Sequence, residues 1–172
     1  MDPKKAGTRI ERVAEDKNKK RYFPLLLLAD EQEKMIDAYL ARGEMFILRR
    51  DGRIVAACVA TDEGGGVLEL KNLAVEPDCR RRGYGRMLVE YLFSHYAGKF
   101  DVMIVGTGES PLIVPFYEQC GFRRSKRVKD FFITYYDHPI VEAGVRLTDM
   151  VYFSREFCPR RDERAEGPGV KE

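Results

Sequence analysis

The sequence lacks several features that would place it in a particular class of protein. No apolar stretch approaches the roughly 20 residues that a membrane-spanning helix needs, and runs such as residues 25–29 are far shorter. The four cysteines form no Cys-x-x-Cys pair and only two histidines accompany them, so we expect no metal site. The formal net charge is +2, which favours neither nucleic acid nor a membrane surface as a partner.

The residues that are present fit one folded domain. The chain has 172 residues, and hydrophobic residues make up 44% of it, which is enough to bury a self-sufficient core. Both ends are polar and charged, so we predict flexible tails at residues 1–7 and 158–172 around a single domain at residues 8–157. No apolar signal segment follows the first residues and the cysteines are scattered, so we expect a cytoplasmic protein with reduced thiols.

The apolar positions between these ends alternate between the period of a helix and the period of a strand. After residue 122 we expect extended structure, which includes the β-branched and aromatic residues 128–136. Predicted strands occupy residues 8–13, 45–50, 53–61, 67–75, 102–106 and 145–153, and predicted helices occupy residues 22–28, 31–41, 83–96 and 111–119. Strands that alternate with helices favour a mixed α/β sheet, with an antiparallel hairpin at each end of the sequence.

The segment that carries chemistry joins the strand at 67–75 to the helix at 83–96. It contains an Arg-x-x-Gly-x-Gly run formed by Arg80, Gly83 and Gly85. Glycines let successive backbone N–H groups approach a phosphate without a clash from Cβ, and the helix N-terminus adds partial positive charge. The run has neither the Rossmann nor the Walker spacing. We interpret it as a cradle for an anion; the alternative is a tight turn with a solvated face of arginines.

This run resembles the hallmark of the GNAT superfamily of N-acetyltransferases, enzymes that use acetyl-CoA. Residues 80–85 match the Gln/Arg-x-x-Gly-x-Gly/Ala motif of that family, and residues 115–122 are similar to its Phe-Tyr-x-x-x-Gly-Phe motif. In the order of its elements the resemblance covers residues 10–157. It implies a mixed, mostly antiparallel sheet of about six to seven strands flanked by helices, with a splay between the fourth and fifth strands.

The resemblance also implies where acetyl-CoA binds. The backbone of the fourth strand would pair with the pantetheine arm at Leu73, Ala74 and Val75. The diphosphate would be held by the loop and the helix start, at Arg80, Arg81, Arg82, Gly83, Tyr84, Gly85 and Arg86. Many relatives carry an Asn that reaches the pantetheine a few residues before the Phe-Tyr pair. Ser110 stands there in this sequence, and its hydroxyl could make a shorter version of that contact.

Two residues match catalytic positions of the family. Tyr117 lies where a tyrosine often protonates the CoA thiolate, although a tyrosine there could also simply pack. Glu69, in the fourth strand, corresponds to a catalytic glutamate of some members and is the candidate general base. The alternative for it is an ion pair with Lys71, two residues on along the same face of the strand. Cys79, beside the cradle, invites a covalent acetyl-cysteine, but direct transfer is usual in the family.

The resemblance therefore predicts an N-acetyltransferase that transfers the acetyl group to a primary amine by direct attack in a ternary complex, with a small-molecule amine favoured. The alternatives are a protein lysine or N-terminal acetyltransferase and a non-catalytic acyl-CoA-binding module. The aromatic-rich segment 130–142 could form a lid or the contact of a homodimer, and the sequence does not decide between them. Acidic residues that border the acceptor site in similar proteins would suit a cationic amine: Glu63, Glu109, Asp130, Asp137 and Glu142.

Overall fold

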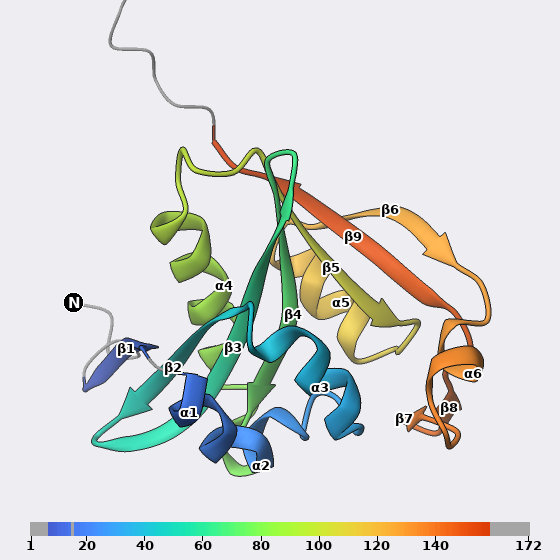
Figure 1. The fold of residues 1–172 in the computed structure, drawn as a ribbon, viewed down its shortest axis with the longest axis horizontal. Coiled ribbons are helices and arrows are strands. Elements are labelled where there is room, and N and C mark those ends of the chain that lie inside the picture. Colours follow the sequence, from blue (N-terminus) through green and yellow to red (C-terminus); the bar gives the residue numbers. More distant parts are fainter. Residues whose placement is uncertain (1–6, 15, 159–172) are drawn as a thin grey trace, which may run out of the picture.

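The computed structural model describes residues 7–14 and 16–158, so the predicted tails lie outside it apart from Gly7 and Cys158. Its centre is a seven-stranded sheet in the order β1-β2-β3-β4-β5-β9-β6 (Figure 1). These strands are β1 Thr8–Val13, β2 Glu44–Arg50, β3 Arg53–Gly64, β4 Val67–Val75, β5 Val102–Gly108, β6 Arg123–Val128 and β9 Met150–Glu156. Every neighbouring pair is antiparallel except β4–β5, which is parallel. The predicted fold class is confirmed.

Helices cover both faces of this sheet (Figure 1). They are α1 Asp16–Lys19, α2 Phe23–Leu26, α3 Glu33–Leu40, α4 Tyr84–His95, α5 Ile113–Gln119 and α6 Phe131–Tyr135, with 3-10 turns at Lys20–Tyr22 and Pro77–Cys79. Along β2, Phe46 and Leu48 join the core under α4 and α5, whereas Met45 and Ile47 join the core under α2 and α3. This period-two division follows from a helix layer on each side of the strand. No helix among the described residues combines the length and the apolar character needed to span a bilayer.

Strand β4 contains the two irregularities that open the sheet. Leu70 and Asn72 pair with consecutive residues of β3, so Lys71 between them is an extra residue, a β-bulge. With β5, the strand pairs only from Val67 to Leu70, opposite residues 102–105. Beyond Leu70 the two parallel strands diverge toward their C-terminal ends (Figure 1). This is the predicted splay between the fourth and fifth strands.

The chain after β6 differs from the sequence prediction. Residues 128–136 do not continue as extended structure, because β6 ends at Val128 and helix α6 follows. The predicted strand 145–153 is interrupted, since its first residues form β8 (Val145–Arg146) in a separate hairpin with β7 (Val141–Glu142). Near the N-terminus, the predicted helix 22–28 is shorter, and α1 precedes it without having been predicted.

A small second core explains the helix that replaced the predicted strand. Phe132 of α6 packs with Ile140 and Leu147, and all three are buried. The N–H of Phe132 also donates to the carbonyl of Thr148 at 2.9 Å. The β propensity of residues 128–136 is a weak preference that depends on packing partners, and here partners from further along the chain decide the conformation.

Candidate active site

The loop between β4 and α4 leaves a run of backbone donors unused. Arg81 and Gly83 have positive φ values of +59° and +88°, and Gly83 immediately precedes α4. The N–H groups of residues 81–86 donate to no acceptor in the described part of the chain. A Cβ on Gly83 would meet no atom within 4 Å, so the space beside it is open. Free N–H groups at the start of a helix form a site for an anionic group.

Two residues at the start of α4 support the shape of this loop. Tyr84 is 2% exposed, and its hydroxyl accepts a hydrogen bond from Nη1 of Arg50 at 2.6 Å. A Cβ on Gly85 would lie 3.2 Å from Cζ of Phe116, so this glycine lets α5 approach α4 closely. Both belong to the predicted cofactor set, and in the structure both make packing or hydrogen-bond contacts with neighbouring elements. The exposed arginines of the loop and of the first turn of α4 are Arg80, Arg81, Arg82 and Arg86.

Strand β4 has a backbone edge beside this loop that no other strand pairs with beyond Leu70. The N–H of Glu76 donates to β3, at a distance of 2.9 Å. Because backbone groups alternate in direction along a strand, those of Ala74 also point to β3, whereas those of Leu73 and Val75 point to the gap beside β5. Nε of Arg80 donates to the carbonyl of Val75 at 3.3 Å. Of the three predicted backbone positions, Leu73 and Val75 therefore face the gap, and Ala74 pairs within the sheet.

Tyr117 lies on the side of α5 that joins the main core. It is 7% exposed and packs against phenylalanine rings on either side. Its hydroxyl has no hydrogen-bond partner among the described residues. Burial raises the pKa of this phenol well above its ordinary value, with smaller contributions from Cys120, Cys58 and Glu142. The side chain is therefore protonated at neutral pH, as a general acid must be before it acts.

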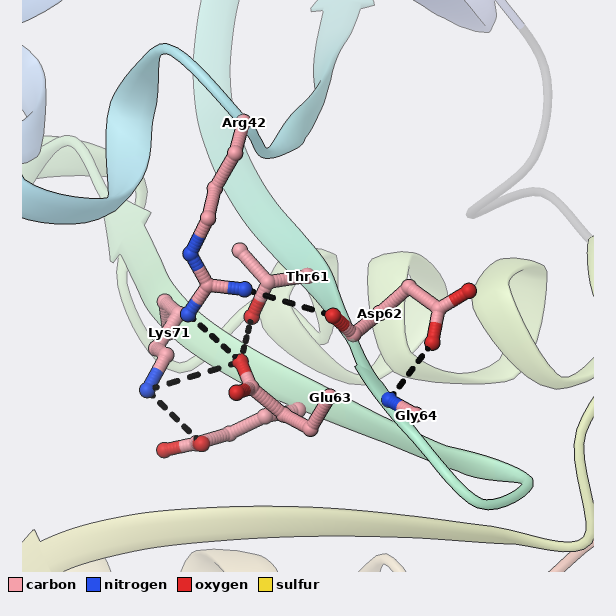
Figure 2. A network of polar contacts seen from close by, with 7 residues as sticks. Arg42, Thr61, Asp62, Glu63, Gly64 and Lys71 are labelled. Carbon is pink, nitrogen blue, oxygen red and sulfur yellow. Dashed lines mark hydrogen bonds and ion pairs between the residues drawn. The ribbon is translucent and has the colours of Figure 1, made fainter.

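Glu69 takes part in an ion pair at the bulge. It is 8% exposed, and its Oε2 lies 2.7 Å from Nζ of Lys71, which is the alternative that the sequence left open. The same Nζ lies 3.8 Å from Oε1 of Glu63, which accepts hydrogen bonds from Thr61 at 2.5 Å and Arg42 at 2.8 Å (Figure 2). Burial opposes the ionisation of Glu63, but these donors and Lys71 outweigh it and hold its pKa below the ordinary value. The bulge thus brings two carboxylates to one lysine.

Ser110 and Cys79 are both buried near the cofactor positions. Oγ of Ser110 accepts a hydrogen bond from the N–H of Leu112 at 3.3 Å, so it stabilises the turn before α5. Its contact with pantetheine stays a prediction.

Burial, together with a hydrogen bond to Asp78, raises the pKa of the Cys79 thiol and so disfavours the thiolate that a covalent route needs. No three His, Cys, Asp or Glu side chains of the described residues are grouped to hold a metal ion.

Two polar contacts between distant segments were not predicted from the sequence. The hydroxyl of Tyr136 donates to Oδ1 of Asp30 at 3.1 Å, and this bond joins the loop before α3 to the segment 130–149. Burial and the neighbouring Asp30 raise the pKa of Tyr136 above its ordinary value. Nδ2 of Asn72 donates to the hydroxyl of Tyr39 at 3.0 Å. Asn72 could have been noticed as a polar residue within an apolar strand, but its distant partners carry no local signal.

The acidic residues predicted to border the acceptor site differ in their pairing. Glu109 is neutralised by Arg124 and Arg127, each 2.6 Å from one of its oxygens, and its pKa is lowered accordingly. Asp130 precedes α6 with a φ of +54°. Glu142 is different, because its Oε2 is buried and has no hydrogen-bond partner in the described part of the chain.

The chain is similar in sequence to known acetyltransferases. Residues 41–124 match the family described as the acetyltransferase (GNAT) domain. The chain is 34% identical over 146 residues to the uncharacterized N-acetyltransferase YvbK of Bacillus subtilis, and the match covers 83% of this chain and 92% of that protein.

Solved structures agree with this family. A GNAT family acetyltransferase from Elizabethkingia anophelis, with acetyl-CoA bound, is 29% identical with a TM-score of 0.82, covering 88% of this chain and 99% of that one. The IAA acetyltransferase from Bacillus cereus ATCC 14579 is 28% identical with a TM-score of 0.80, covering 87% and 99%. The chain therefore belongs to the GNAT superfamily of N-acetyltransferases and is an acyltransferase. The relative that holds acetyl-CoA supports the same acetyl donor here.

Proposed function

We propose that this protein transfers the acetyl group of acetyl-CoA to the primary amine of a small molecule, by direct attack in a ternary complex. One observation carries the proposal: the unused N–H groups of residues 81–86 lie at the end of the same strand whose Leu73 and Val75 face the gap. Phosphate oxygens are the partners that free N–H groups at a helix start prefer. The amides of a pantetheine arm can pair with a free strand edge as another strand would.

In the proposed reaction, the backbone N–H of Leu73 donates to the thioester carbonyl oxygen and stabilises the negative charge that develops there. The amine nitrogen forms a bond to the carbonyl carbon, and the carbon–sulfur bond breaks. Tyr117 gives its phenolic proton to the departing sulfur. Of the two protons that the substrate ammonium loses, one passes to Glu69, directly or through water, and the other restores Tyr117. The ion pair with Lys71 orients Glu69 for this role.

The acceptor side supports a small amine rather than a peptide. The segment 130–149 is tied to the loop before α3 by the hydrogen bond from Tyr136 to Asp30 and by one from the N–H of Asp137 to Gln32 Oε1, at 3.4 Å. In this proposal, these ties narrow the approach to the gap between β4 and β5. A peptide acceptor needs an open groove that continues across the sheet, because its flanking residues also have to be accommodated.

An acceptor screen tests this proposal. The purified protein is mixed with acetyl-CoA and with alkyl monoamines, diamines, arylalkylamines or peptides that carry a free N-terminus or a lysine, and the released thiol is detected. Release that depends on a small amine is the expected result. Turnover with peptides alone would replace the small-molecule acceptor by a protein. No turnover with any amine, while acetyl-CoA still raises the melting temperature, would contradict the proposal.

A further inference from the structure

The hairpin of β7 and β8 is held firmly at the end of β5. Its strands are joined by Ala143 and Gly144, which have φ values of +50° and +77°, the left-handed pair of a tight two-residue turn. At its base, the N–H of Leu147 donates to the carbonyl of Ile140 at 2.9 Å. The Leu147 side chain fills the place where a Cβ on Gly108, the last residue of β5, would lie. A residue of this hairpin therefore has a fixed position relative to the splayed strands.

Glu142 is the hairpin residue whose side chain turns inward. Its Oε2 is buried and accepts no hydrogen bond from the described residues. A buried carboxylate oxygen without a donor costs free energy, since the water that solvated it is lost and nothing replaces it. The other glutamates near the gap do not share this deficit, because Glu69 is paired with Lys71 and Glu63 with Arg42. The structure thus leaves one acceptor atom that a bound group with N–H donors would satisfy.

This carboxylate acts on the residue that we assign as the general acid. The hairpin that carries Glu142 packs through Leu147 on Gly108, at the C-terminal end of β5, where β5 no longer pairs with β4. The charge of Glu142 is also a minor contributor, after burial, to the raised pKa of Tyr117. The acceptor nitrogen has to come close to the same phenol, because Tyr117 protonates the sulfur that this nitrogen displaces. The hairpin thus brings the buried Oε2 of Glu142 to the end of the sheet at which β4 and β5 diverge.

We propose that Glu142 binds the ammonium group of the acceptor, by accepting an N–H hydrogen bond at its buried Oε2. The inference rests on the proposed function and narrows it to amines that carry positive charge when they bind. An ammonium has three N–H donors, so it can satisfy Glu142 and still give up the protons that the reaction removes. A neutral hydroxyl compound would leave the carboxylate charge uncompensated and would be rejected as an acceptor.

The test compares the wild-type protein with Glu142→Gln, using the same panel of amines and thiol detection. Glutamine keeps the shape of the side chain but removes its charge. The KM for the amines that the wild type uses should rise about 10- to 100-fold, the loss expected for one charge-assisted hydrogen bond. The dissociation constant for acetyl-CoA, measured by calorimetry, should not change. Glu118→Gln is the matched control, because Glu118 is exposed and lies next to Tyr117 in the chain.

Two outcomes overturn the inference, and they can be told apart. If the wild type turns over an amine and Glu142→Gln does so with the same KM, the inference is wrong and the proposed function stands. If the wild type uses no amine, the proposed function fails and the inference fails with it. Should Glu142→Gln melt far below the wild type, Glu142→Asp decides, because it keeps the charge and shortens the side chain. A raised KM with unchanged acetyl-CoA affinity then supports the inference, and an unchanged KM contradicts it.

Discussion

The cofactor side and the acceptor side of the splay are built in different ways. The cofactor side is one continuous stretch, residues 67–96, in which a strand, a loop and a helix follow one another. The acceptor side joins the loop before α3 to the segment 130–149, and its bond from Tyr136 to Asp30 spans 106 positions of the chain. A site made of contiguous residues leaves a motif in the sequence. A site assembled from distant segments leaves none.

The two sides also differ in the polar groups that they leave unused. The cofactor side has spare donors, namely the N–H groups of residues 81–86. The acceptor side has a spare acceptor, since Oε2 of Glu142 is buried without a hydrogen-bond partner among the described residues. Donors suit a phosphate and acceptors suit an ammonium. If this division is right, each side can be disabled without the other.

The largest effect is expected from Gly83→Val, which should abolish acetyl-CoA binding. The branched side chain would occupy the open space in front of the free N–H groups. Gly52→Val is the matched control, because Gly52 has a φ of +83° and equally open surroundings in the β2–β3 hairpin, so the backbone strain is similar. Both variants would be titrated with acetyl-CoA in a calorimeter. An equal loss of affinity in the two would contradict the cradle.

Tyr117→Phe should affect the chemical step and spare both binding sites. We expect kcat to fall by about 100-fold or more, with the dissociation constant for acetyl-CoA unchanged. Stability should also be close to that of the wild type, because the hydroxyl has no hydrogen-bond partner in the described structure. Tyr96→Phe is the control, since its hydroxyl donates to Glu44 and its loss should cost about 1 kcal/mol of unfolding free energy without changing kcat. Unchanged turnover in Tyr117→Phe would remove this residue from the mechanism.

Glu69→Gln tests which alternative describes the carboxylate beside Lys71. If Glu69 is the general base, kcat should fall by about 10- to 100-fold while acetyl-CoA binds normally. If it serves only the ion pair, the melting temperature should fall and kcat should not. Glu11→Gln is a suitable control, because Glu11 is also a strand glutamate paired with arginines, Arg9 and Arg49, and it lies in β1 at one edge of the sheet. Steady-state kinetics and thermal melts of both variants separate the two cases.

The smallest expected effect concerns the contact between the loop before α3 and the segment 130–149. His138 contacts Asp137, and its Nε2 lies 3.6 Å from Oε2 of Glu31 in the loop before α3. The hydrogen bond to Asp137, followed by the charges of both carboxylates, raises the pKa of His138. A raised pKa means that the stabilisation is present below the ordinary histidine pKa and is lost as the pH rises through the raised value.

Between about pH 5.5 and about pH 8, the melting temperature of the wild type should therefore drop slightly more than that of His138→Gln. The difference between the two drops should be about 1 °C or less, because the pair is exposed. Acetyl-CoA affinity should be the same in both proteins at each pH, because the cradle lies in another part of the chain. An identical pH dependence of the two melting temperatures would show that His138 does not hold the acceptor segments together.

Local signals account for the parts of the fold that could be predicted. Asp51 and Gly52 turn the chain between β2 and β3 with φ values of +48° and +83°, as an Asp-Gly pair between two apolar runs indicates. The helix that begins after Gly83 was also predicted from a local signal. Glycine adopts the positive φ found before this helix without a clash from Cβ. The helix at residues 131–135 was missed, since Phe132 has to meet Ile140 and Leu147 before the segment gains anything by being helical.

The sequence by itself determined the family, most of the strands and helices of the main sheet, and the glycine-containing turn into α4, because these depend on backbone sterics and hydrogen bonding within a few consecutive residues. Only the tertiary structure decided that Glu69 lies against Lys71, that Ala74 turns its backbone away from the gap, and that Glu142 has a buried oxygen without a partner. The physical reason is that burial and charge pairing depend on which distant segments meet, and no short stretch of sequence contains that information.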